Sequence, residues 1–271
     1  MIVEPRLASA VMLLRDHVSG QGIEVFMLRR VIQSDFMPDV YVFPGGSVTD
    51  DDRAAEQTEG VSMRLAPFMV DLAGPTALGS GTRAAALREL FEEAGILLAY
   101  HAGNILAMTE EDNARFRNYR QAFHRREGSL VDMARAEDVL LATDQLSYFA
   151  HWITPEGMPK RFDTHFFLAA APGDQEAVHD HLETSEGVWI QPAEALARAG
   201  RGEFPLVFAT VHQLRELAAF GSVKEAVDFA DTHPVETHVP VLIHERGKTR
   251  VYLAEDQSDS WDVPESMTKI M

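Results

Sequence analysis

The sequence predicts a mixed α/β fold in which short strands alternate with amphipathic helices along the chain. Two observations support this prediction. The apolar runs at residues 7–15 and 23–29 have the length and the flanking residues of buried strands, whereas residues 82–94 repeat apolar positions at helical spacing. With 271 residues, 46% of them apolar, the chain is long enough to bury a sizeable core. We expect a single domain over residues 1–271.

The first part of the chain is predicted to be extended. The two strands above are joined by a turn near residues 19–22, which contain two glycines. Residues 40–44 form a third extended run, and we expect Gly45-Gly46 to end it. Residues 53–81 contain several glycine and proline breakers, so we interpret them as an insertion with a short helix.

The middle of the chain is predicted to be mainly helical. In the helix 82–94, Thr82 is the expected N-cap, and Gly95 lies where a left-handed residue ends a helix. A further helix is expected to start at Thr109, because three acidic residues follow and favour the positive end of the helix dipole. More helix is expected between residues 130 and 150, so that residues 104–150 form a helical insertion.

The last part of the chain returns to alternating strands and helices. Strands are expected at residues 162–170 and 187–190, and Pro192 opens a short helix to about residue 199. Residues 205–255 are predicted to hold helices and a terminal hairpin. Within this range we expect a helix at 206–219, a capping box Ser222-x-x-Glu225 that starts another helix, and hairpin strands at 239–245 and 250–254.

Composition excludes several classes of function. Asp and Glu total 42 against 24 Lys and Arg, so the formal charge is −18, which repels nucleic acids and anionic membranes. The chain has no cysteine, which excludes disulfides and thiol chemistry. The sequence shows no secretory signal and no apolar run long enough to span a membrane. We therefore expect a cytoplasmic protein without nucleic-acid or membrane partners; a homodimer remains open.

The helix 82–94 gathers three carboxylates. Glu89, Glu92 and Glu93 follow the i, i+3, i+4 pattern and therefore lie within a few ångströms of one another, with Arg88 as the nearby cation. Like charges at this spacing destabilise a helix, and a hard divalent cation such as Mg²⁺ or Mn²⁺ would offset that cost. A solvated acidic face is the alternative for this helix considered alone.

The loop before this helix favours the metal site. The segment Phe43-Pro44-Gly45-Gly46 ends a strand, and its glycines allow the backbone to approach a ligand closely. Together, loop and helix resemble the Nudix box, G-x5-E-x7-R-E-U-x-E-E-x-G-U, in which U is a bulky aliphatic residue. The second half of the box is matched without a gap by residues 88–96, Arg-Glu-Leu-Phe-Glu-Glu-Ala-Gly-Ile.

The first half of the box departs from the pattern. Asp52 occupies the position of the first box glutamate, and 35 residues separate it from Arg88, where the pattern has seven. This spacing resembles a split-box subgroup of Nudix hydrolases that includes the mammalian peroxisomal coenzyme A diphosphatase. The resemblance implies an α/β/α sandwich with a mixed sheet. It covers about residues 7–220, and the segments that carry it include Phe36-Met37-Pro38, Trp152-Ile153-Thr154-Pro155 and the run from Arg161 to Phe167.

The resemblance implies a role for each box residue. Glu89, Glu92 and Glu93 would hold Mg²⁺ or Mn²⁺, together with a backbone carbonyl near Gly46. Arg88 would pair with a box carboxylate and fix its orientation, a task that Asp52 would share.

The general base is less closely defined by the sequence. Family members often place a glutamate before a strand that carries a tryptophan. Here Glu183 and Glu186 precede Trp189, with Glu183 better placed in the loop. A metal-binding glutamate such as Glu93 is the alternative base, and two solvated loop acids are the third interpretation.

Several cations are candidates for binding the phosphates of a substrate. Arg29 and Arg30 are consecutive at the end of a strand, so their side chains point to opposite faces of the sheet. Arg161, before a strand expected to enter the cleft, is the third candidate. The alternative for each is a solvated surface position. Four histidines, His151, His165, His179 and His181, are expected to be structural or superficial, without a third partner at metal-ligand spacing.

The expected function is metal-dependent hydrolysis of a phosphoanhydride bond in a nucleoside diphosphate derivative. The subgroup resemblance implies coenzyme A or an acyl-coenzyme A as substrate, with Arg29, Arg30, Lys160 and Arg161 available for its additional 3′-phosphate. NADH and ADP-ribose are alternative substrates. A non-catalytic module that senses a nucleotide is the alternative of another class, although such modules usually lose the box glutamates.

Overall fold

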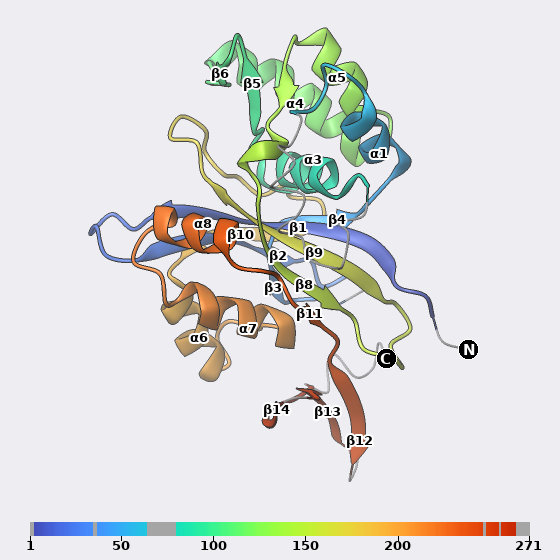
Figure 1. Ribbon diagram of the computed structural model, residues 1–271, viewed down its shortest axis with the longest axis vertical. Helices are drawn as coiled ribbons and strands as arrows, with labels where there is room; N and C mark the ends of the chain where they lie inside the picture. Colours follow the sequence, from blue (N-terminus) through green and yellow to red (C-terminus); the bar gives the residue numbers. More distant parts are fainter. Residues whose placement is uncertain (1–2, 35–36, 64–79, 246–247, 255, 264–271) are drawn as a thin grey trace.

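The computed structural model describes residues 3–34, 37–63, 80–245, 248–254 and 256–263. Its centre is an eight-stranded mixed sheet with the order β10-β2-β1-β9-β8-β11, to which β3 and β4 are added beside β2 and β1 (Figure 1). The pairs β1–β9 and β8–β11 are parallel. The strands of this sheet are β1 (Arg6–Asp16), β2 (Ile23–Arg30), β3 (Tyr41–Val42), β4 (Gly45–Ser47), β8 (Ser147–Ile153), β9 (Phe162–Ala170), β10 (Thr184–Ile190) and β11 (Thr237–His238).

One face of the sheet is covered by helices and a small second sheet. The helix α3 (Thr82–Ala94) lies directly on this face, and the other helices of this layer pack around it (Figure 1). The apolar positions of α3, among them Leu87 and Leu90, join the sheet residues Val11 and Leu13 in one buried cluster. The remaining elements here are α1 (Asp50–Gln57), α4 (Glu110–His124), α5 (Leu130–Ala136), the 3-10 helix η1 (Thr143–Gln145), and the strands β5 (Ala99–His101), β6 (Asn104–Ile105) and β7 (Leu140–Leu141).

The other face carries the C-terminal helices. Even-numbered residues of β1, such as Met12 and Leu14, form a second buried cluster with helix residues that include Leu214 and Ala226. A separate three-stranded sheet contributes Val251 to the same cluster. Two layers of helices thus enclose the mixed sheet, as predicted. The elements on this face are α6 (Pro192–Gly200), α7 (Phe208–Leu217), α8 (Val223–Thr232), β12 (Val241–Glu245), β13 (Lys248–Leu253) and β14 (Asp256–Asp262).

Several sequence predictions agree closely with these elements. The strand 162–170 has the predicted bounds, and β1 pairs antiparallel with β2 as expected for two strands joined by a turn. Thr109 caps α4 through a capping box with Asp112. Ser222 caps α8, but the side chain of Glu225 accepts from the backbone N–H of Gly221 and not from that of Ser222.

Three local predictions were wrong. The helix expected between residues 130 and 150 is present only as α5, whereas residues 147–150 belong to the strand β8, because they pair with β9 in the sheet interior. Gly45 and Gly46 do not end the extended run but form β4, which pairs with β1. The N-cap of α3 is Gly81, whose φ of 88° favours glycine, and Thr82 is the first helical residue.

Some predictions lie outside the described residues. They concern Phe36, most of the insertion (residues 64–79) and the hairpin turn at 246–247. The part of the insertion that is described contains the expected short helix, α1. Among the described residues, no helix has the length and apolar character that crossing a membrane would require.

Candidate metal and phosphate site

The helix α3 is held rigidly because its termini and one face are fixed by different partners. It ends at Gly95, whose φ of 73° is the left-handed conformation predicted for a glycine C-cap. Its last turn is held by α4, since Arg120 donates to the carbonyl oxygens of Glu92 (2.7 Å) and Glu93 (2.9 Å). His124 Nε2 also lies 3.0 Å from the carbonyl oxygen of Glu92. Carbonyls that a helix end leaves unpaired are thereby satisfied.

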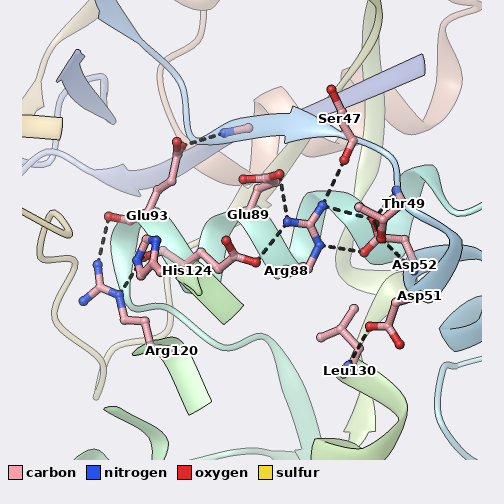
Figure 2. A network of polar contacts seen from close by, with 12 residues as sticks. Ser47, Thr49, Asp51, Asp52, Arg88, Glu89, Glu93, Arg120, His124 and Leu130 are labelled. Carbon is pink, nitrogen blue, oxygen red and sulfur yellow. Dashed lines mark hydrogen bonds and ion pairs between the residues drawn. The ribbon is translucent and has the colours of Figure 1, made fainter. Parts of the chain in front are cut away.

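Arg88 joins α3 to the segment that precedes the insertion. Its guanidinium donates to both carboxylate oxygens of Asp52, over 2.8 and 3.0 Å, and to the carbonyl oxygen of Ser47 over 3.0 Å (Figure 2). Asp52 is fully buried and also accepts from the backbone N–H and the hydroxyl of Thr49, which closes a capping box on α1. The two halves of the split motif therefore meet through one bidentate ion pair.

The same guanidinium also contacts two carboxylates of its own helix. Its Nη1 donates to Glu89 Oε1 over 2.8 Å and to Glu92 Oε1 over 3.0 Å. Burial lowers the pKa of Arg88, but the charge of Glu89 and the hydrogen bond and charge of Asp52 outweigh it, so that the pKa is raised overall. Arg88 is thus a permanent cation among carboxylates, in the pairing that the resemblance implied.

The carboxylates themselves are short of positive charge. Glu93 is 5% exposed and accepts a 2.9 Å hydrogen bond from the backbone N–H of Gly45. Burial and then the charge of Glu89 raise the pKa of Glu93 well above its usual range. Burial likewise raises the pKa of Glu89 to about 7 and that of Glu92 above its ordinary value, although Arg88 acts in the opposite direction. A hard divalent cation would supply the missing charge, so this oxygen-rich donor set fits Mg²⁺ or Mn²⁺.

The glycine pair brings the backbone of β4 against α3. A Cβ atom built on Gly46 would lie 2.2 Å from Glu89 Oε1, so a larger residue here would force the carboxylate of Glu89 out of its present position. The backbone of β4 therefore lies close to Glu89. The binding of a metal ion by a backbone carbonyl near Gly46 stays a prediction.

A cavity of about 830 Å³ opens beside these groups. Its polar end includes Gly45, Gly46, Arg88, Glu89 and Glu92. Its remaining walls are largely apolar and come from β8, β9, α7 and the C-terminal sheet, with the residues Trp152, Phe162, Phe166, Phe208, Leu242 and Trp261. The cavity thus borders both charged groups and a largely apolar extension.

Of the two candidate bases, Glu183 lies at the cavity and Glu186 does not line it. Glu183 is exposed, and its charge acts on Glu93 to raise the pKa of that carboxyl. Asp180 fixes the loop that presents Glu183, since it accepts from the backbone N–H groups of residues 182, 183 and 184. Glu186 accepts a 2.7 Å hydrogen bond from the hydroxyl of Tyr41. Sequence reasoning missed the role of Asp180, although an Asp shortly before a strand is a turn signal.

Of the four predicted phosphate cations, Arg30 lines the cavity, Lys160 does not line it, and Arg29 and Arg161 are engaged elsewhere. Arg29 points to the other face of β2 and pairs with Asp39 over 2.8 Å. Arg161 is buried and donates to the carbonyl oxygens of Thr154 and Val3 over 2.9 Å each, so it fastens the N-terminal segment. Two arginines that the sequence analysis did not single out, Arg6 and Arg126, line the cavity.

The prediction that the histidines lack a third metal-binding partner was wrong for one pair. His151 and His165 lie opposite each other on β8 and β9, and their potential ligand atoms lie within 4.8 Å of each other and of a carboxylate oxygen of Asp163. Burial and then the neighbouring His151 lower the pKa of His165 to about 4, so its ring is neutral near pH 7. Strand register creates this cluster, and sequence spacing does not reveal it.

Comparison with known proteins gives consistent matches. The family model described as the NUDT19 Nudix domain matches residues 73–217. The acyl-coenzyme A diphosphatase NUDT19 of Xenopus laevis is 25% identical over 244 residues, and the putative nudix hydrolase 7 of Caenorhabditis elegans is 27% identical over 214 residues. These alignments cover 79% and 75% of this chain, and 64% and 61% of the relatives, so the chain spans less than two thirds of their length.

A solved structure supports the fold. The crystal structure of a NUDIX hydrolase from Alicyclobacillus acidocaldarius superposes with a TM-score of 0.66 at 23% identity. The superposition covers 86% of this chain and 99% of that protein. The two chains therefore share an architecture.

The ion pair between Arg88 and Asp52 gives a first prediction. We expect Asp52→Asn to lower the free energy of unfolding by about 3 kcal/mol, because a buried cation loses its bidentate partner. Asp50→Asn is the matched control on the same helix, because Asp50 is fully exposed and pairs with Arg53 at the surface. Urea unfolding of the three proteins measures both effects, and equal losses in the two variants would contradict the prediction.

A second prediction concerns pH and Mg²⁺. The pKa of Glu89 is raised from 4.5 to about 7 in the folded chain, so the proton held there stabilises the metal-free protein most at low pH. This stabilising contribution is lost as the pH rises through about 7. At higher pH, Mg²⁺ would neutralise the carboxylate of Glu89 in place of the proton. The increase in Tm caused by Mg²⁺ should therefore grow with pH over this interval, and Glu89→Gln should flatten the trend. A constant increase in the unaltered protein would refute the prediction.

Proposed function

The chain belongs to the Nudix family, with a domain of the NUDT19 type, and from this premise we propose that it hydrolyses a phosphoanhydride bond in a nucleoside diphosphate derivative, dependent on Mg²⁺ or Mn²⁺. One observation carries the proposal: Arg88, Glu89 and Glu92 line a cavity large enough for a nucleotide derivative, and Glu93 lies close enough to Glu89 for their charges to interact. A scaffold or a nucleotide sensor would not require a buried cluster with this excess of negative charge. The intact glutamates therefore favour an enzyme over a sensing module.

We assign the metal-binding role to the side chains of Glu89, Glu92 and Glu93 and to the backbone near Gly46. When bound there, the divalent ion neutralises phosphate charge and lowers the pKa of a water molecule. Arg88 orients Glu89 and Glu92 through Nη1, and Asp52 in turn holds the guanidinium. The orientation of the carboxylates thus precedes metal binding, which reduces the reorganisation required in the reaction.

We assign the general base to Glu183. It lies at the cavity, its side chain is exposed, and the loop that carries it is fixed by Asp180. Glu93 is the alternative base, because burial keeps its pKa high. Arg30, on the same cavity, is the cation assigned to a substrate phosphate, because its charge also acts on Glu93 and so lies near the carboxylates.

Coenzyme A or an acyl-coenzyme A is the substrate that we propose. The NUDT19 relatives are named as acyl-coenzyme A diphosphatases. The cavity of this chain supports the same class, because its apolar extension suits a pantetheine or acyl arm, and Arg6, Arg30 and Arg126 along its walls suit several phosphates. NADH and ADP-ribose are the alternatives, since loops that vary within one fold determine the substrate.

A third prediction separates metal binding from base catalysis. Glu93→Gln should lower kcat by orders of magnitude and weaken the response to Mg²⁺, because it removes a charged ligand. Glu183→Gln should lower kcat by about 10²-fold, leave KM and the Mg²⁺ response nearly unchanged, and flatten the acid limb of the pH profile. Phosphate-ester products released from a panel of nucleoside diphosphate derivatives, with Mg²⁺ and then with chelator, provide the measurement.

The control for this experiment is Glu186→Gln, which changes a nearby acid on β10 that is bonded to Tyr41 and does not line the cavity. It should leave kcat nearly unchanged. A folded Glu93→Gln variant that keeps more than about a tenth of the turnover at saturating Mg²⁺ would refute the metal assignment. An equal loss in the Glu183 and Glu186 variants would refute the base assignment alone.

A fourth prediction tests the substrate. Coenzyme A and dephospho-coenzyme A differ only in the 3′-phosphate, so a cation dedicated to that group should raise kcat/KM for coenzyme A by about tenfold or more, as expected for one charged hydrogen bond. Equal values, or a preference for NADH or ADP-ribose, would defeat the coenzyme A assignment while leaving phosphoanhydride hydrolysis intact.

A further inference from the structure

A second group of metal-ligating side chains lies apart from the box carboxylates, on the strands β8 and β9. His151 and His165 are opposite each other in the register, and Asp163 precedes His165 by two residues on the same face of β9. The two imidazoles stack with centroids 4.2 Å apart and an interplanar angle of 13°. Strand pairing has therefore brought two imidazoles and one carboxylate together.

We propose that His151, His165 and Asp163 form a second metal site, which binds a transition-metal dication of the Zn²⁺ type. The site lies outside the Nudix motif, and its ligands differ in kind from the box glutamates. It is independent of the hydrolysis proposed above.

The potential ligand atoms already converge. Asp163 Oδ1 lies 2.5 Å from His151 Nε2 and 3.9 Å from His165 Nε2, and the candidate ligand atoms all lie within 4.8 Å of one another. Ligands around a tetrahedral Zn²⁺ with bonds of about 2.0–2.1 Å are separated by about 3.3 Å. The observed spacings fall on both sides of that value, so seating an ion requires side-chain rotations that even out these distances.

The second nitrogen of each ring is already engaged. His151 Nδ1 lies 2.8 Å from Thr237 Oγ1 of β11, and His165 Nδ1 lies 2.8 Å from the hydroxyl of Tyr148 on β8. Such partners fix the orientation of metal-binding imidazoles and leave Nε2 directed at the ion. A histidine pair that served only to fill the core would not require both Nε2 atoms to face one carboxylate.

Burial gives this group the form of an open metal site. The histidine side chains are 3% exposed each, whereas the side chain of Asp163 is 31% exposed. The ion would thus reach the site from the Asp163 side and retain a position for water there. Two nitrogen ligands favour Zn²⁺, Co²⁺ or Ni²⁺ over Mg²⁺, which prefers oxygen ligands alone.

Titration of the whole chain described above with Co²⁺ tests the proposal, because Co²⁺ in a site of low coordination number absorbs visible light. Saturating Mg²⁺ is kept present to occupy the box carboxylates. We expect one equivalent of Co²⁺ to give the absorption band, Zn²⁺ to displace it, and Zn²⁺ to raise Tm. The same band should persist in Glu93→Gln, which alters the box and not the histidine cluster.

Asp163→Asn is the decisive variant, because the amide oxygen can still accept from His151 while the charged ligand is lost. It should weaken Co²⁺ binding by at least about tenfold, since even the loss of a group that hydrogen-bonds to a metal ligand lowers metal affinity about 10- to 100-fold. His165→Gln is a second variant, should Asp163→Asn fail to fold. His101→Gln, at an exposed hairpin position, is the control and should bind as the unaltered protein does. Equal Co²⁺ affinity in the unaltered protein and a folded cluster variant, or no band at all, would overturn the proposal.

Discussion

The guanidinium of Arg88 is the constraint on which the site depends. It pairs with Asp52 before the insertion and with Glu89 and Glu92 on its own helix, and it donates to the carbonyl oxygen of Ser47. One buried cation therefore fixes the distance between α1, β4 and α3. Because the ion pair is bidentate, it specifies orientation as well as proximity. A long insertion can therefore separate the two halves of the motif in sequence while the ion pair keeps them together in space.

The clustered carboxylates of the site concentrate negative charge at a cost to the stability of the metal-free protein. A single arginine cannot balance the acids around it, so burial raises the pKa values of Glu89, Glu92 and Glu93 together. A divalent ion would relieve the excess negative charge, which couples metal binding to proton release and to folding. The overall charge of −18 makes this local arrangement more important, because an anionic substrate is attracted only by placed cations.

The two faces of the central sheet have different tasks. On one face α3 packs through its apolar stripe and presents its glutamates towards β4, where a residue larger than Gly46 would displace the carboxylate of Glu89. On the other face, the C-terminal helices and the sheet β12–β14 extend the cavity with apolar side chains such as Leu242 and Trp261. A substrate with a charged head and a long apolar arm would contact both regions. The C-terminal sheet, which the family model does not cover, thus belongs to the cavity wall.

The sequence alone determined the helix that carries Glu89, Glu92 and Glu93 and its glycine end, because periodicity and turn chemistry are local properties. The layered fold was implied by the family resemblance. Tertiary structure decided what depends on pairing between distant segments. It made residues 147–153 a strand, turned Arg161 towards backbone carbonyls, and placed His151 opposite His165. Register and burial arise from contacts between strands, and no spacing along one segment encodes them.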